Sequence, residues 1–263
     1  MDYFTYINIP ETRPVFLIYS DSKDLITSLQ IYYPVESEPQ SPDELVTITF
    51  YHGILDLSGK TIFCNTLIFA VRATLRFIHT QLRARGSEHI LLHGTALKFR
   101  KKGVLFLAGT KTGKTTFSLY ALSHYNCKYI CDDLLIVNMH TLCVRRYTRP
   151  LLLREKGMPS LANEDQYAYT SNLCRYAIYP NQMCDEKWIP FESVVQLNRT
   201  NLAPSGINDS TEQILAMNLY NTGTMLENLN KITKQSSRLH FYRVFYNECS
   251  EIIPLLQKRS III

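Results

Sequence analysis

Residues 104–116 combine the residue types that bind a nucleoside triphosphate. Apolar residues lead into a loop of small residues, then into Gly113-Lys114-Thr115 and a stretch of helical character. The backbone N–H groups of such a loop converge on phosphate oxygens, and the positive end of the next helix faces the same anion. Lys114 can reach the β- and γ-phosphates, and the Thr115 hydroxyl can ligate Mg²⁺. The candidate nucleotide-binding residues are Ala108, Gly109, Thr110, Lys111, Thr112, Gly113, Lys114, Thr115 and Thr116.

The strict form of this phosphate-binding loop, the P-loop, has a glycine at the position that Ala108 occupies. Because a methyl group is small and Gly109 follows, we expect the loop to close around phosphate. An apolar strand before the motif, a helix after it and an acidic pair downstream argue against a chance match. The sequence therefore predicts that the chain binds ATP together with Mg²⁺.

The second signal is an apolar strand that ends in two carboxylates, Tyr129-Ile-Cys-Asp132-Asp133. Such a strand can return beside the P-loop. One carboxylate can then hold Mg²⁺, and the other can take the proton of an attacking hydroxyl, as a positioned Asp does in kinases. The alternative is an Asp pair that only caps a turn or a helix. The pattern leaves open which carboxylate has which role.

A third signal is Leu91-Leu-His93-Gly94, at the end of the strand that precedes the P-loop strand. A lone histidine is usually structural. This one sits where adjacent strands would place it near Asp132, so it can orient that carboxylate or adjust its pKa.

The elements that must position these residues begin at residue 89, where short apolar strands alternate with helices. This pattern predicts an α/β (α+β) core, a sheet covered by helices. Residues 210–213 resemble a capping box that opens a helix to about residue 234. Residues 145–185 are polar and are predicted to be irregular. Strands are predicted at residues 90–92, 104–107, 128–131, 134–137, 194–197 and 239–246, and a helix at residues 115–124.

The first 60 residues are predicted to form a small β meander. A helix at residues 60–85 follows, because its apolar residues recur every three or four positions. Arg72, Arg76, His79 and Arg83 form a basic stripe beside that apolar face, either as a solvated flank or as a docking edge for an acidic peptide. The strands of the meander are predicted at residues 3–9, 14–19, 28–35 and 45–51.

Composition limits the partners. The net charge is +5, from 28 basic and 23 acidic residues, which suits an anionic ligand, but no nucleic-acid recognition motif is present. Seven cysteines without a C-x-x-C pair indicate neither a disulfide framework nor a zinc site. We see no signal peptide and no apolar run long enough for a membrane span. The expected setting is a reducing cytoplasm.

Residues 89–138 resemble the catalytic core of HPr kinase/phosphorylase, in which a His-Gly at a strand end, a short strand, a P-loop and an apolar-Asp-Asp segment follow in order. The resemblance implies a P-loop mixed sheet similar to that of phosphoenolpyruvate carboxykinase. It also implies that His93 and Asp132 are catalytic, and that Thr115 and Asp133 serve the metal, with the division between the two aspartates open. The implied domains are a β-rich region with a long helix (1–86) and a kinase core (87–263).

A closer resemblance is to the HPr-kinase-like proteins encoded with lasso-peptide biosynthesis in bacilli, which share the β-rich start, the long helix and the same core. It implies a cytoplasmic bacterial kinase, dependent on ATP and Mg²⁺, that phosphorylates the carboxy-terminal Ser side chain of a precursor peptide. Related kinases are often hexameric, so a homo-oligomer is an open expectation. Arg is suited to carboxylate and phosphate, so four residues are candidates for binding substrate or phosphate rather than a solvated basic loop. They are Arg145, Arg146, Arg149 and Arg154.

Two other functions remain open. One is a kinase of a different hydroxyl acceptor, such as an HPr-like protein or a free amino acid. The other is a nucleotide-binding regulatory subunit with little catalysis, which would need neither His93 nor the Asp pair.

Overall fold

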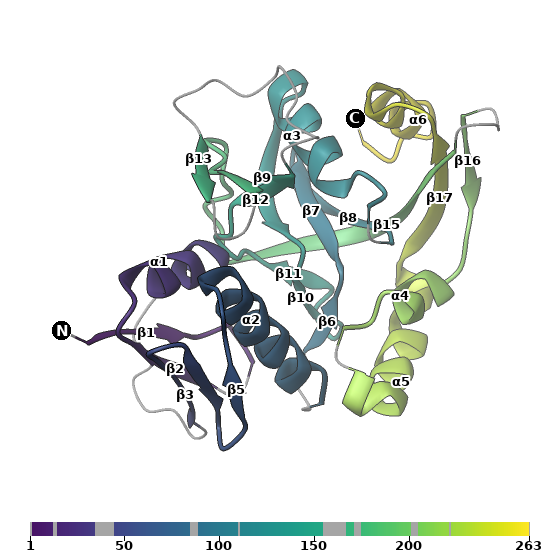
Figure 1. Ribbon diagram of the computed structural model, residues 1–263. Helices are drawn as coiled ribbons and strands as arrows, with labels where there is room; N and C mark the ends of the chain where they lie inside the picture. The colour runs from purple at the N-terminus through teal and green to yellow at the C-terminus, as the bar shows by residue number, and fades with distance from the viewer. Residues whose placement is uncertain are drawn as a thin grey trace.

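In the described residues, the computed structural model of the protein contains three sheets, and a long helix joins the two larger ones (Figure 1). None of the helices in the described ranges is long and apolar enough to cross a bilayer. The predicted mixed α/β class is confirmed by the sheets and helices below. The structure describes residues 2–12, 15–34, 45–84, 89–109, 111–154, 167–170, 175–200, 205–220 and 222–262.

The smaller, N-terminal sheet has the strand order β1-β2-β3-β4-β5. β2 and β3 run parallel and the other neighbours antiparallel, so this sheet is not a simple meander. A parallel pair needs a crossover, and α1 (Lys23–Tyr32) provides it. The strands are β1 (Tyr3–Ile7), β2 (Val15–Ser20), β3 (Leu45–Tyr51), β4 (Ile54–Leu57) and β5 (Thr61–Phe63).

The strand predicted at residues 28–35 is therefore wrong, because most of that segment belongs to α1. The Ser22 hydroxyl accepts a hydrogen bond from the Leu25 N–H at 3.3 Å and caps the helix. Leu25, Leu29 and Tyr32 are buried at helical spacing on one face. The β-branched and aromatic residues at the end of the segment suggested a strand, but the cap and the spacing decided for a helix.

The second helix, α2 (Leu67–Ala84), is shorter than the predicted 60–85. Residues 61–63 pair with β4 instead, and the Thr66 hydroxyl accepts the Phe69 N–H at 3.2 Å at the start of the helix. The apolar face is buried as predicted, by Ala70, Val71, Thr74, Leu75, Ile78 and Leu82. The predicted domain boundary at 86/87 falls outside the described residues.

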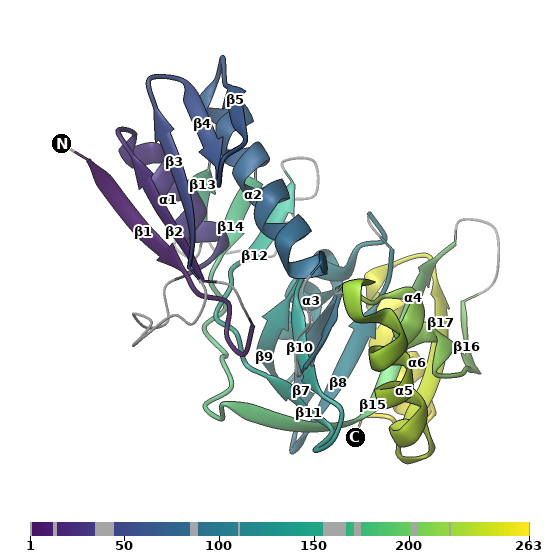
Figure 2. The same cartoon turned by 90° about the horizontal axis from the view of Figure 1, so that it is seen from below.

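The larger sheet has the order β6-β10-β11-β15-β8-β7-β9, and β17 joins β15. β15 lies parallel to both β8 and β17, whereas β7 is antiparallel to its neighbours, so the sheet is mixed. Its strands are β6 (Ile90–Leu92), β7 (Gly94–Phe99), β8 (Lys102–Leu107), β9 (Cys127–Asp132), β10 (Leu135–Asn138), β11 (Cys143–Arg145), β15 (Trp188–Arg199), β16 (Gly206–Asp209) and β17 (His240–Tyr246). α3 (Lys114–His124) and α6 (Ile252–Lys258) belong to this unit (Figure 2).

Two further predictions in this unit need correction. Residues 145–185 are not wholly irregular, because β12 (Leu151–Arg154), β13 (Tyr167–Thr170) and β14 (Arg175–Ile178) form a small antiparallel sheet. The helix predicted from 210 to 234 is two helices, α4 (Gln213–Met217) and α5 (Met225–Gln235).

The break between α4 and α5 comes from pairing with β6. The Asn218 carbonyl accepts the His93 N–H at 2.9 Å, and the Tyr220 N–H donates to the Leu91 carbonyl at 2.7 Å. The predicted capping box does not form, since the N-cap of α4 is Glu212 without a side-chain bond. Backbone pairing with β6 therefore outweighs the helical preference of residues 218–220.

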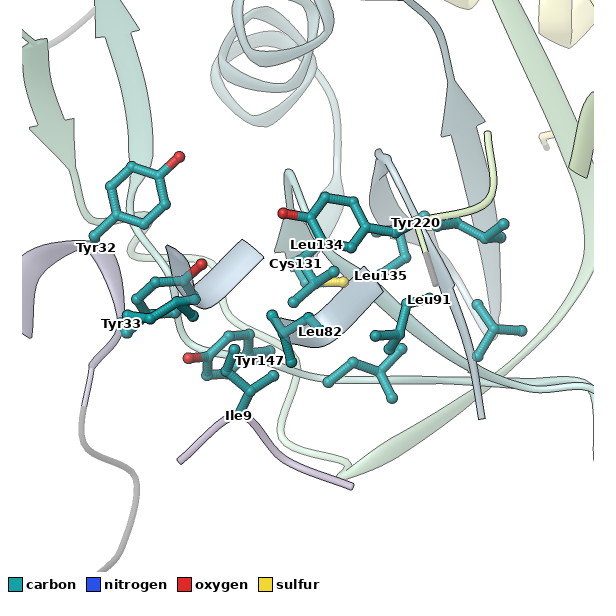
Figure 3. Close-up of a cluster of buried hydrophobic side chains, with 14 of the residues drawn as sticks. Ile9, Tyr32, Tyr33, Leu82, Leu91, Cys131, Leu134, Leu135, Tyr147 and Tyr220 are labelled. Carbon is teal, nitrogen blue, oxygen red and sulfur yellow. The ribbon is translucent and has the colours of Figure 1, made fainter. Parts of the chain in front are cut away.

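The two units share one hydrophobic core. Figure 3 shows Ile9, Tyr32 and Tyr33 of the N-terminal unit with Leu82 of α2 and Leu135 of the larger sheet. All five side chains are buried. The N-terminal unit is thus packed directly against the larger sheet, beside the start of β10 that follows the acidic pair.

Candidate active site

The P-loop connects β8 to α3, as predicted. Gly113 caps the helix with a φ of 90°, a left-handed conformation that favours glycine. The Thr112 hydroxyl donates to the Gly109 carbonyl at 2.7 Å, and the Tyr246 hydroxyl of β17 donates to the Thr112 carbonyl. The loop is therefore held from within and from β17. Thr110 lies outside the described residues.

Lys114 is buried at the first turn of α3, under the loop. Its ammonium donates to the carbonyls of Ala108 and Gly109, at 2.8 and 3.0 Å. Burial lowers the pKa of Lys114, while Asp132 and Asp133 raise it in part. The positive charge thus lies where the helix N-terminus and the loop amides would face a phosphate.

Asp132 ends β9 and faces α3. The Thr115 hydroxyl donates to Asp132 Oδ2 at 2.9 Å. Asp132 is only 4 % exposed, and its Oδ1 has no hydrogen-bond partner within the described part of the chain. Burial and the neighbouring charge of Asp133 raise the pKa of Asp132. An orphaned carboxylate oxygen beside a P-loop hydroxyl is a donor set that fits Mg²⁺.

Asp133 has different surroundings. Its φ of 70° turns the chain between β9 and β10. Oδ1 lies 3.3 Å from His93 Nδ1, Oδ2 lies 3.3 Å from Arg149 Nη2, and the Tyr32 hydroxyl donates to Oδ2 at 3.2 Å. Although burial acts in the opposite direction, the hydrogen bond from His93 and the Arg149 charge lower the pKa of Asp133 far below its usual value. Asp133 therefore stays ionised, with 38 % of its side chain exposed.

His93 links Asp133 to the P-loop lysine. The Lys114 ammonium lies 3.0 Å from His93 Nε2, and His93 Nδ1 lies 3.2 Å from the Asp133 carbonyl. An ammonium has no acceptor, so Nε2 must accept from Lys114 and the imidazole proton must lie on Nδ1, facing Asp133. The geometry therefore assigns both the tautomer and the orientation of the ring.

The expected pairing of His93 with Asp132 is not the one that forms. β6 pairs with β10 through Leu92 and Leu135, which brings His93 beside Asp133. Asp132 pairs with Thr95 of β7, on the side that α3 covers. The order of the strands therefore decides which carboxylate lies beside His93, and this order could not be predicted from the local sequence pattern.

Of the four candidate arginines, only Arg149 reaches the acidic pair among the side chains that the structure describes. Arg145 Nε lies 3.2 Å from Glu11 Oε1, and Arg146 donates to the Cys184 carbonyl at 2.9 Å. Arg154 ends β12, and its side chain lies outside the described part. The arginines are therefore dispersed rather than gathered on one loop.

The aromatic side chains that surround Arg149 were not predicted from the sequence. The guanidinium carbon lies 4.5 Å from the Tyr32 ring centre and 5.0 Å from that of Tyr33, and Nε donates to the Tyr32 carbonyl at 2.9 Å. His79 of α2 packs against Tyr220 with ring centres 5.5 Å apart. Burial lowers the pKa of His79 to about 4. No local motif signals this contact, because Tyr32 and Arg149 are 117 residues apart.

Comparisons with known proteins assign no role to any residue of this chain, so the assignment of roles depends on the geometry described above. No protein-family profile matches the chain, and no curated protein matches it. Among solved structures, the Hpr(Ser) kinase/phosphatase from Coxiella burnetii is similar over 65 % of this chain and 96 % of that one, with 14 % identity and a TM-score of 0.36. A superposition this loose transfers no residue roles.

Proposed function

We propose that this chain is an ATP-dependent kinase that phosphorylates the side-chain hydroxyl of a carboxy-terminal Ser in a precursor peptide. One observation carries the proposal. Two carboxylates with separate partners, Asp132 with Thr115 and Asp133 with His93, meet at one P-loop. Nucleotide binding alone requires no second carboxylate with its own histidine. The peptide acceptor and the cytoplasmic setting follow from the resemblance described above.

The nucleotide would be held by the loop amides and the Lys114 ammonium. Thr115 and Asp132 would hold Mg²⁺, which neutralises charge on the phosphates when it is bound. This assignment gives the metal-binding role to Asp132, whereas the resemblance gave it to Asp133. It is supported by the contact between Thr115 and Asp132, and by the buried, unpartnered Oδ1.

Asp133 would act as the base. Its side chain is exposed enough to meet an acceptor, whereas Asp132 is buried. The acceptor oxygen forms a bond to the γ-phosphorus as the bond to the β–γ bridging oxygen breaks. The hydroxyl proton passes to Asp133, and ADP leaves. His93 would position Asp133 through Nδ1–H.

The test is mass spectrometry after incubation with ATP, Mg²⁺ and a peptide that ends in Ser. We expect a mass gain of one phosphate, mapped to that Ser and lost when it is replaced by Ala. Free serine and an HPr-like protein serve as competing acceptors. Phosphate on either of these, but not on the peptide, would move the function to a different kinase substrate.

Nucleotide binding is measured separately by calorimetry, with Lys114→Ala as the defective variant and Lys101→Ala, in the exposed turn before β8, as the charge-matched control. Intact affinity in Lys114→Ala would argue against a working P-loop. Binding without transfer to any acceptor would favour the regulatory subunit instead.

A further inference from the structure

The outer face of α2 carries an uncompensated row of positive charge. The helix has 18 residues and contains no Asp or Glu. Arg72, Arg76 and Arg83 are all exposed. In the described part of the chain, none of the three has a carboxylate within ion-pair distance. Acidic residues one turn away would offset these charges, and α2 has none.

The three arginines share one face of the helix. Spacings of four and seven residues place Arg72, Arg76 and Arg83 in one row, and Phe69 lies on the same face with 49 % of its surface exposed. His79, which completed the predicted stripe, lies instead under Tyr32, Tyr33 and Tyr220. We refer to Phe69, Arg72, Arg76 and Arg83 as the α2 stripe.

The α2 stripe ends beside the candidate active site. The Arg83 guanidinium carbon lies 5.0 Å from the centre of the Tyr220 ring. The Tyr220 N–H donates to the Leu91 carbonyl, two residues before His93. Burial and the Asp133 charge raise the pKa of the Tyr220 phenol, while Arg83 lowers it, so the Tyr220 phenol interacts with both charges. The last turn of α2 thus adjoins the exposed base.

We propose that the α2 stripe binds an acidic segment of the acceptor peptide and leads its Ser towards Asp133. The proposal rests on the proposed function and names the class of substrate that the site accepts. Arg72 and Arg83 are eleven residues apart, which is about 16 Å along a helix. An extended peptide spans that length with about five residues. The row therefore matches one peptide strand with carboxylates before the acceptor Ser.

The test uses fluorescence anisotropy with a labelled peptide that ends in Ser after a run of Glu, and a second peptide with Gln in place of each Glu. We expect Arg72→Ala/Arg76→Ala to weaken binding of the Glu peptide roughly threefold to tenfold at low salt, with the difference shrinking as salt rises. Affinity for the Gln peptide should not change. Both arginines are exposed and Ala favours helix, so circular dichroism should show a folded variant.

The matched control is Lys234→Ala/Lys258→Ala, which removes two exposed positive charges from α5 and α6. Equal weakening in this control would show a general charge effect and overturn the proposal. Equal binding of the two peptides by the parent protein would overturn it as well. The proposal would also be overturned if Arg72→Ala/Arg76→Ala lost binding to anionic phosphatidylserine vesicles but kept its binding to the peptide.

Binding and transfer are separated by the readout. Charge-dependent peptide binding without phosphate transfer would support the docking surface and reject the kinase. If Arg72→Ala/Arg76→Ala transfers phosphate as fast as the parent protein, with equal KM for the Glu and Gln peptides, the kinase is supported and the docking surface is rejected.

Discussion

Adjacent carboxylates acquire different chemistry here because they face opposite sides of one strand end. Asp132 points to Thr115 with a raised pKa, and Asp133 points to His93 and Arg149 with a lowered one. Two acids whose surroundings separate their protonation are a common sign of divided roles. The division can be tested with isosteric changes.

Asp133→Asn should keep ATP and Mg²⁺ binding but slow phosphate transfer by about 10²–10⁴-fold, the usual contribution of general base catalysis. Asp132→Asn should instead raise the Mg²⁺ concentration needed for half-maximal transfer. Magnesium titrations of initial rate distinguish the two. The reverse pattern would restore the metal role to Asp133 and the base role to Asp132.

His79 should make the free energy of unfolding depend on pH, and the direction of this dependence follows from its lowered pKa. Its pKa is lowered from 6.5 to about 4, so between these values the unfolded chain binds more protons than the folded one. The free energy of unfolding should therefore fall as pH drops from about 6.5 to 4, by about 3 kcal/mol at most.

His79→Phe keeps an aromatic ring beside Tyr220 and removes the proton site, so it should flatten this part of the pH profile. Urea unfolding at several pH values, compared between parent and variant, measures the difference. Parallel profiles would assign the acid sensitivity to other groups.

At the scale of elements, α1 brings the N-terminal unit into the site. It ends at Tyr32, whose hydroxyl donates to Asp133 and whose carbonyl accepts from Arg149. Tyr32 is thus a positioning residue for the proposed base. The contact exists only because residues 23–32 form a crossover helix rather than a strand.

Tyr32→Phe should lower kcat several-fold and leave the KM for ATP unchanged, because it removes one hydrogen bond to Asp133 and keeps the ring on Arg149. With one stabilising donor lost, the acidic limb of the kcat profile should move to higher pH. A purely structural residue would change stability and leave the position of that limb unaltered.

At the scale of the whole molecule, Arg149 connects the N-terminal unit with the unit of the larger sheet. It is 2 % exposed, stacks on Tyr32 and Tyr33, and pairs with Asp133. Breaking a buried pair leaves a charge without compensation. Arg149→Leu should therefore lower the free energy of unfolding by about 2–4 kcal/mol, less than for a fully buried pair because Asp133 is partly exposed.

Adding Asp133→Leu to Arg149→Leu should recover part of that loss, since no unpaired carboxylate then remains. Denaturant unfolding of the two single variants and the double variant measures the coupling. Additive losses would show that the pair contributes no coupling energy. Two separate transitions in Arg149→Leu would show that the units unfold independently.

The sequence by itself determined the parts of the site that are contiguous. The strand, loop and helix around Lys114 and the acidic strand end depend on local apolar spacing and on glycine at Gly113, and they form as predicted. Two of the element predictions that failed, at residues 28–35 and 210–234, failed where a side-chain cap or pairing with β6 outweighed composition.

Only the tertiary structure decided which residues meet. His93 contacts Asp133 because β6 lies next to β10, and Arg149 meets Tyr32 because the N-terminal unit packs against the larger sheet. Strand order and the packing of units depend on the burial of many distant side chains together. A local pattern carries the chemistry of each residue, but the partner that directs this chemistry is chosen by contacts between distant segments.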